Sequence, residues 1–193
     1  VTVKRKLIGH NTDAFGFVRS LQKDLKFDPH GKRILVIGAG GAARACVYGL
    51  AEKGAHSICI AEVDRKKARS LVRHFDSVFP DTQFSIARSQ AEDFSALLPA
   101  VDLLVNATPV GLHAKDPVLV PARCFPKKRR IAVYDLIYNK KTALLKTAEK
   151  RGCPFAGGIG MLLYQGVRSF ELWTGKKGPV NDMRRALAKA LRV

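Results

Sequence analysis

The sequence predicts an α/β fold, a Rossmann-like doubly wound parallel sheet. Short apolar runs alternate with amphipathic segments, which is the pattern of βαβ units. The run "RILVIG" at 33–38 is typical of a parallel strand buried on both faces, and a glycine cluster follows it at the start of a helix. The chain has 193 residues, 47% of them hydrophobic, so we expect a single domain with a real core.

The elements follow in order from the first helix. Thr12 or Asp13 is well placed as its N-cap, and its apolar residues recur at helical spacing. Strands are predicted at 33–38, 57–63, 83–87, 102–111 (ending in a loop) and 130–138. Further helices are predicted at 38–54, 64–75, 91–98, 142–152, 157–175 and 180–192. Phe170 and Trp173 are assigned to packing, and 107–129 to a loop over the carboxyl edge of the sheet, where ligands bind in such folds.

The composition narrows the class of protein. No apolar run approaches the roughly 18–20 residues that a membrane span needs, and the start "VTVKRKLIG" lacks a signal-peptide core. Four cysteines lie far apart, so we expect buried free thiols, no metal site and a cytoplasmic location. The net charge of +18 would attract anions, yet no nucleic-acid motif accompanies it. We interpret the charge as solvated helix faces that also attract a phosphorylated cofactor.

The glycine cluster predicts a dinucleotide site. The residues Gly38, Ala39, Gly40, Gly41, Ala42 and Ala43 contain G-x-G-x-x-A between a strand and a helix. In this pattern the first glycine permits a tight turn and the second lets the backbone approach a pyrophosphate. The helix dipole and the free amides then face the phosphates.

Glu62 ends the next strand, 21 residues past Gly41. An acid at this distance hydrogen-bonds a ribose 2′-hydroxyl and repels a 2′-phosphate, so NAD is the expected cofactor. Arg65, Lys66 and Lys67 start the following helix and could neutralise a 2′-phosphate, which keeps NADP as the alternative.

Five motifs in order resemble the shikimate dehydrogenase family, which includes the quinate/shikimate dehydrogenases. They are "NTDAFG", "GAGGAARA", "NATPVG", "DLIYN…TALL" and "GGIGMLLYQGVRSFELWTG", and the resemblance runs from Gly9 to about Gly175. Members of that family have an N-terminal substrate domain and a C-terminal Rossmann-like cofactor domain. The chain resembles the second part, so we expect it to lack the substrate domain. Residues 1–30 would be the hinge and first helix, and 31–193 the NAD(P)-binding domain with its C-terminal helices.

The resemblance also implies roles for single residues. Asp13 matches the acid of a catalytic Lys–Asp pair, whose lysine lies upstream in the family, so the chain alone is expected to be inactive. Thr12, Tyr138 and Gln165 match substrate-binding positions. Ala107, Thr108 and Pro109 match a loop that contacts the cofactor. Leu136 and Gly158 match positions beside the nicotinamide, and Met161 would pack near the ring.

The sequence departs from the family at three places. Glu62-Val63-Asp64 stands where NADP-type members have Asn-Arg-Thr, which is similar to the NAD-preferring branch. The segment "YNKKT" lacks the family's proline and is one residue shorter, which alters the loop that carries Tyr138. Gly157 stands where an acid is common.

The expected function is therefore hydride transfer between NAD(P) and shikimate or quinate, with the missing substrate domain as a partner. Exposed apolar surface on the first helix would favour a homodimer. The alternative is a non-catalytic nucleotide-binding module whose basic surface holds an acidic partner or nucleic acid. The sequence does not separate shikimate from quinate.

Overall fold

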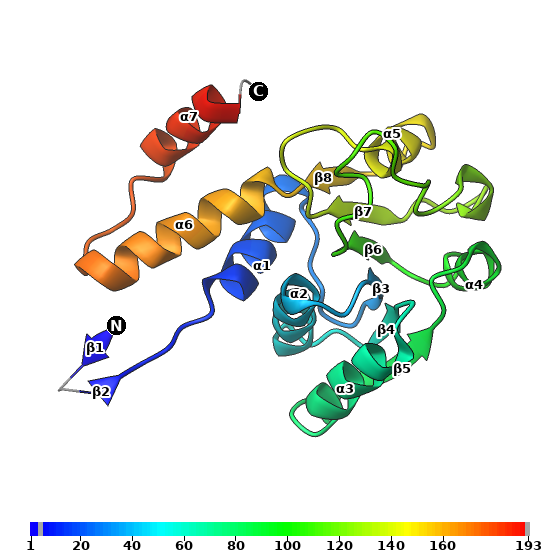
Figure 1. Ribbon diagram of the computed structural model, residues 1–193, viewed down its shortest axis with the longest axis horizontal. Coiled ribbons are helices and arrows are strands. Elements are labelled where there is room, and N and C mark those ends of the chain that lie inside the picture. Colours follow the sequence, from blue (N-terminus) through cyan, green and yellow to red (C-terminus); the bar gives the residue numbers. More distant parts are fainter. Residues whose placement is uncertain (4–5, 192–193) are drawn as a thin grey trace.

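The computed structural model describes residues 1–3 and 6–191. Its centre is a six-stranded sheet in the order β5-β4-β3-β6-β7-β8, and every neighbouring pair is parallel (Figure 1). The strands are β3 (Arg33–Ile37), β4 (Ser57–Ala61), β5 (Gln83–Ala87), β6 (Leu103–Asn106), β7 (Ala132–Asp135) and β8 (Phe155–Gly157). This arrangement confirms the predicted doubly wound, Rossmann-like fold. A separate antiparallel pair, β1 (Thr2–Val3) and β2 (Lys6–Leu7), precedes it.

Helices cover both faces of the sheet. The α-helices are α1 (Thr12–Asp24), α2 (Gly41–Glu52), α3 (Arg65–Asp76), α4 (Ala91–Leu97), α5 (Ala143–Lys150), α6 (Ile159–Thr174) and α7 (Val180–Leu191). A 3-10 turn spans Ala122–Cys124. One core cluster joins side chains of α1, α2, α3 and α6 to one face of the sheet, and a second joins those of α4 and α5 to the other face. None of the helices in the described ranges is long and apolar enough to cross a membrane. All four cysteines are buried free thiols, as predicted.

The strand order reverses between β3 and β6, which lie side by side. Because all strands are parallel, the last residues of β3, β4, β6 and β7 meet at one edge of the sheet. The carboxyl edge at such a switch point is where open α/β sheets bind ligands. The segments that leave this edge are therefore the ones that can form a site.

Helices α1 and α6 pack against each other with almost no space between their backbones (Figure 1). A Cβ on Gly16 would lie 2.6 Å from the carbonyl oxygen of Met161, and one on Gly160 would lie 2.3 Å from Ser20 Oγ. Ser20 Oγ in turn accepts a hydrogen bond from the buried hydroxyl of Tyr134 at 2.8 Å, which ties α1 to β7. Glycine is required at position 16, where a Cβ would clash with the backbone of α6, whereas a Cβ at position 160 would have to displace the side chains of Asp24 and Ser20.

Three predictions about the elements are wrong. The N-cap of α1 is Asn11, because its side-chain oxygen accepts from the amides of both Asp13 and Ala14 at 3.1 and 3.2 Å. The segment 157–175 is not helical from its start, since Gly157 ends the edge strand β8 and α6 begins at Ile159. Trp173 does not pack in the core, because it lies 76% exposed near the end of α6.

Candidate dinucleotide site

The turn between β3 and α2 has the geometry of a phosphate-binding loop. Gly38 has a φ of +109°, and a Cβ there would lie 3.0 Å from the carbonyl oxygen of Ala107. Gly40 is the N-cap of α2 and makes no side-chain cap, so the first amides of the helix are open to a ligand. A Cβ on Gly40 would meet no atom within 4 Å, which leaves room for a bound group beside the backbone. These features fit a pyrophosphate at the helix N-terminus.

A hollow of about 610 Å³ opens in front of this turn. Eight of the predicted cofactor residues line it: Gly38, Ala39, Gly40, Gly41, Glu62, Ala107, Thr108 and Pro109. The hollow therefore collects residues from the ends of β3, β4 and β6, as expected at a switch point. Two residues of the glycine cluster lie outside the lining: Ala42 is exposed in the first turn of α2, and Ala43 is buried in the core.

Glu62 lies directly against the phosphate loop. One carboxylate oxygen accepts from the Ala39 amide at 2.9 Å, and the other accepts from the Asp64 amide at 3.1 Å. The carboxylate is thus fixed at the end of β4, where a ribose hydroxyl would hydrogen-bond to it. Asp64 caps α3, since its side chain accepts from the Lys66 and Lys67 amides.

Of the three basic residues predicted to attract a 2′-phosphate, Lys67 lines the hollow and Arg65 and Lys66 do not. Lys67 and Arg44 line the hollow, whereas Arg65 lines a neighbouring hollow with Arg88 and Asp93. The guanidinium of Arg44 lies over the Phe75 ring, 5.9 Å from its centre, which holds it between α2 and α3. The sequence signal for Lys67 is the basic run after Glu62, whereas Arg44, the fourth residue of α2, lies within the GAGGAARA motif but was given no role by it.

The loop after β6 forms the wall opposite the glycines. Asn106 is completely buried, and its side-chain oxygen accepts from the Thr108 amide at 3.0 Å and from the Thr108 hydroxyl at 2.7 Å. Its amide nitrogen donates to the Val110 carbonyl at 3.2 Å. The predicted loop residues Ala107, Thr108 and Pro109 are therefore held in one conformation by the strand that precedes them.

The three residues predicted beside the nicotinamide come after the next two strands. Leu136 directly follows β7, and Gly158 and Met161 lie at the start of α6. Gly158 packs so closely on the strand-end loop that a Cβ would lie 1.9 Å from the carbonyl oxygen of Leu136. Met161 is buried in the core cluster against which Leu136 packs. Leu136, Gly158 and Met161 are thus brought together, although they are outside the lining of the hollow.

The predicted substrate-side residues group at the start of α1 and the middle of α6. The Thr12 hydroxyl donates to Gln165 Oε1 at 3.5 Å and accepts from the Ser169 hydroxyl at 3.2 Å. Asp13 is exposed and faces α2, where its charge adds to the burial that raises the pKa of the Cys46 thiol. Tyr138 is 47% exposed on the loop after β7. Among the described residues, no hydrogen bond joins Tyr138 to Thr12, Asp13 or Gln165.

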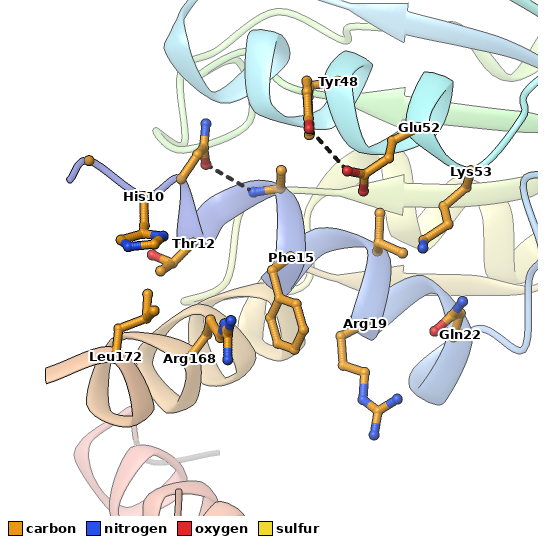
Figure 2. Close-up of a pocket in the computed structure, with 14 residues that line it drawn as sticks. His10, Thr12, Phe15, Arg19, Gln22, Tyr48, Glu52, Lys53, Arg168 and Leu172 are labelled. Atoms are coloured by element: carbon orange, nitrogen blue, oxygen red, sulfur yellow. Dashed lines mark hydrogen bonds between the residues drawn. The ribbon is translucent and has the colours of Figure 1, made fainter. Parts of the chain in front are cut away.

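A second hollow, of about 550 Å³, lies on the outer face of α1 between α2 and α6 (Figure 2). Thr12 is one of the residues that line it, and the Arg168 guanidinium lies 5.6 Å from the centre of the Phe15 ring. The Tyr48 hydroxyl donates to Glu52 at 3.0 Å across its α2 side (Figure 2). This hollow contains neither the glycine loop nor Asp13, so it is separate from the dinucleotide site.

The chain matches two models of known families. Residues 20–122 match the shikimate / quinate 5-dehydrogenase model, and residues 158–188 match the model of the shikimate 5′-dehydrogenase C-terminal domain. Shikimate dehydrogenase (NADP(+)) of Geobacter metallireducens is 43% identical over 196 residues, which cover 99% of this chain and 68% of that enzyme. The corresponding enzyme of Methanopyrus kandleri is 40% identical and is covered over 64% of its length.

Solved structures agree with these matches. Shikimate 5-dehydrogenase of Listeria monocytogenes, solved with shikimate and NAD, has a TM-score of 0.88 and 32% identity over 97% of this chain and 66% of its own. Quinate dehydrogenase of Corynebacterium glutamicum, solved with NAD, has a TM-score of 0.84 and 30% identity over 94% of this chain and 63% of its own. The chain therefore spans about two thirds of the relatives' length. It belongs to the shikimate/quinate dehydrogenase family.

Proposed function

We propose that the chain binds a nicotinamide dinucleotide at the carboxyl edge of its sheet and serves an oxidoreductase that acts on shikimate or quinate. The observation that carries the proposal is the Gly38 turn, whose positive φ and open helix N-terminus face the hollow that Glu62 borders. The family supports the reaction class, because the relatives that this chain matches are named shikimate dehydrogenases.

When bound, the nicotinamide exchanges a hydride with the carbon that bears the substrate hydroxyl. The hydroxyl proton must leave the oxygen in the same conversion, which calls for a general acid–base group. We propose Asp13 for this role, paired with a lysine of a substrate domain, while Thr12, Gln165 and Tyr138 orient the substrate hydroxyls. None of the ion pairs in the described part of the chain involves Asp13, so its carboxylate is open to such a lysine. On this proposal residues 1–30 act as the hinge, and the chain alone does not turn over substrate.

We propose NAD as the preferred cofactor. Glu62 is fixed against the Ala39 amide, and a 2′-phosphate at that place would meet its negative charge. Lys67 and Arg44 act in the opposite direction, since both line the hollow and would attract that phosphate. Of these three side chains, Glu62 is the one that hydrogen-bonds to the phosphate loop within the described residues, so we propose that its charge decides the preference.

A fluorescence titration of the chain with NADH and, separately, NADPH tests the proposal at moderate salt. Saturable binding with a lower Kd for NADH supports both the site and the role of Glu62. A lower Kd for NADPH keeps the dinucleotide site and overturns the NAD preference. If neither cofactor binds, the proposed function of this hollow is wrong.

A further inference from the structure

Asp135 is a completely buried carboxylate at the end of β7, and the proposed chemistry has no direct use for it. It is the register partner of Asn106, the last residue of β6, which is also completely buried. One Asp135 oxygen accepts from the Asn106 side-chain amide at 3.0 Å. The two side chains thus join neighbouring strands at the edge where the dinucleotide site lies.

The same carboxylate fixes the segment that follows β7. It accepts from the Ile137 amide at 3.1 Å and from the Thr142 hydroxyl at 2.6 Å. Thr142 is also the N-cap of α5, since its Oγ1 accepts from the Leu145 amide at 3.3 Å. The Ile137 carbonyl accepts from the Gly158 amide at 3.1 Å, so the start of α6 is attached to this segment as well.

Asn106 carries the constraint into the dinucleotide hollow. Its side-chain oxygen accepts from the amide and hydroxyl of Thr108, and its nitrogen divides its two hydrogens between Asp135 and the Val110 carbonyl. Thr108 and Val110 both line the hollow. Without Asp135, one Asn106 N–H would be left without a partner in the core, so the asparagine could rotate and release the loop.

We infer that Asp135 is a positioning residue of the dinucleotide site, which holds the 107–110 loop against the Gly38 turn through Asn106. This inference rests on the proposed function, because it concerns binding in the same hollow. The carboxylate is costly to bury, since desolvation outweighs its three hydrogen bonds and raises its pKa. Two aliphatic side chains at positions 106 and 135 would fill the same space at a lower desolvation cost, but they could not hydrogen-bond to Thr108 and orient it.

The test is the Kd for NADH of purified variants, measured below the temperature at which each begins to unfold by circular dichroism. Asp135→Leu keeps a similar volume and offers no acceptor, so both the Asn106 N–H and the Thr142 hydroxyl lose their partner. Thr142→Val removes that donor at nearly constant volume and provides a second variant if the first does not fold. Loss of one such hydrogen bond predicts a Kd weaker by roughly 3- to 10-fold in each variant. Thr142→Ser keeps the hydroxyl and should restore the wild-type Kd.

Asp102 supplies the matched control at the opposite edge of the sheet. Its carboxylate also accepts from a backbone amide, that of Arg33 at 2.8 Å, and it pairs with Arg129. Asp102→Asn should lower stability and leave the NADH Kd unchanged. Equal binding by wild type, Asp135→Leu and Thr142→Val would overturn the inference alone, while a wild-type chain that binds neither NADH nor NADPH would overturn the proposed function and this inference with it.

Discussion

The carboxylate of Glu62 accepts a hydrogen bond from the Ala39 amide 2.9 Å away, and this contact joins the end of β4 to the turn that follows β3. A side chain held in this way cannot swing aside to admit a phosphate without losing the bond. Its charge and its fixed position act together, and the two can be separated by substitution.

Glu62→Gln keeps an oxygen for the Ala39 amide and removes the charge, whereas Glu62→Ser removes both. We expect both variants to bind NADPH more tightly relative to NADH, by about tenfold for Glu62→Ser, which corresponds to about 1.4 kcal/mol. The measurement is the ratio of the two Kd values by fluorescence titration. An unchanged ratio in both variants would remove Glu62 from the choice of cofactor.

Lys67 and Arg44 are expected to attract a 2′-phosphate, because both line the hollow. Lys67→Ala and Arg44→Ala should each weaken NADPH binding more than NADH binding, by roughly 3- to 10-fold. Arg65→Ala is the matched control, since Arg65 lines the neighbouring hollow. A loss of NADPH affinity in Arg65→Ala alone would assign the phosphate to Arg65 rather than to Lys67 and Arg44.

Substitution of the two glycines of the turn should affect different properties: stability at Gly38 and NADH binding at Gly40. Gly38→Ala puts a Cβ 3.0 Å from the Ala107 carbonyl oxygen at a φ of +109°, so it should lower the free energy of unfolding by about 1–3 kcal/mol. A Cβ on Gly40 meets no protein atom within 4 Å, so Gly40→Ala should fold almost normally and lose affinity for NADH. Urea unfolding and NADH titration of both variants separate the effects. Normal NADH binding by Gly40→Ala would contradict a pyrophosphate at this backbone.

The local motifs predicted which residues gather around the hollow, because each motif follows the end of a strand. Gly38 and Glu62 come directly after the paired last residues of β3 and β4, so the strand–turn–helix order of the sequence places them at the same edge of the sheet. Arg44 could not be predicted in this way, since it reaches the hollow by lying over Phe75 of another helix. Asn106 and Asp135 are 29 residues apart in the sequence and meet because of the register between β6 and β7. A local sequence pattern does not report that register.

The errors in the fold have equally specific causes. The strand β8 has three residues, Phe155–Gly157, too few to show an alternating pattern beside the glycines that follow. The prediction that Trp173 packs in the core is wrong because of its place on the helix. The buried stripe of α6 includes Gly160, Leu163, Tyr164 and Val167, at helical spacing, and Trp173 lies off that stripe.

Asp13 can be tested once the chain is joined to a substrate domain, in trans or by fusion, that carries the expected lysine. Asp13→Asn should then reduce kcat by about 10²- to 10⁴-fold, the range that a general acid–base group contributes. The NADH Kd of the chain should stay the same, because Asp13 is outside the lining of the dinucleotide hollow. Full activity of the variant would show that the exposed carboxylate has no part in proton transfer.

Asp135 also gives the stability of the fold a defined dependence on pH. Burial raises its pKa above the usual value of 3.8, and its hydrogen bonds from Thr142, Ile137 and Asn106 offset this only in part. At a pH between the pKa of Asp135 in the unfolded chain and its higher pKa in the folded chain, the folded chain binds a proton that the unfolded chain has released. The contribution of this group to stability therefore increases as the pH falls.

The Asp135→Asn variant has no carboxyl group at this position to titrate. The stability of wild type minus that of Asp135→Asn, from urea unfolding at a series of pH values, should therefore rise as the pH is lowered through the folded pKa and become constant below about 3.8. A difference that instead grows as the pH rises would mean that the three donors outweigh burial and that the folded carboxylate prefers its charged form.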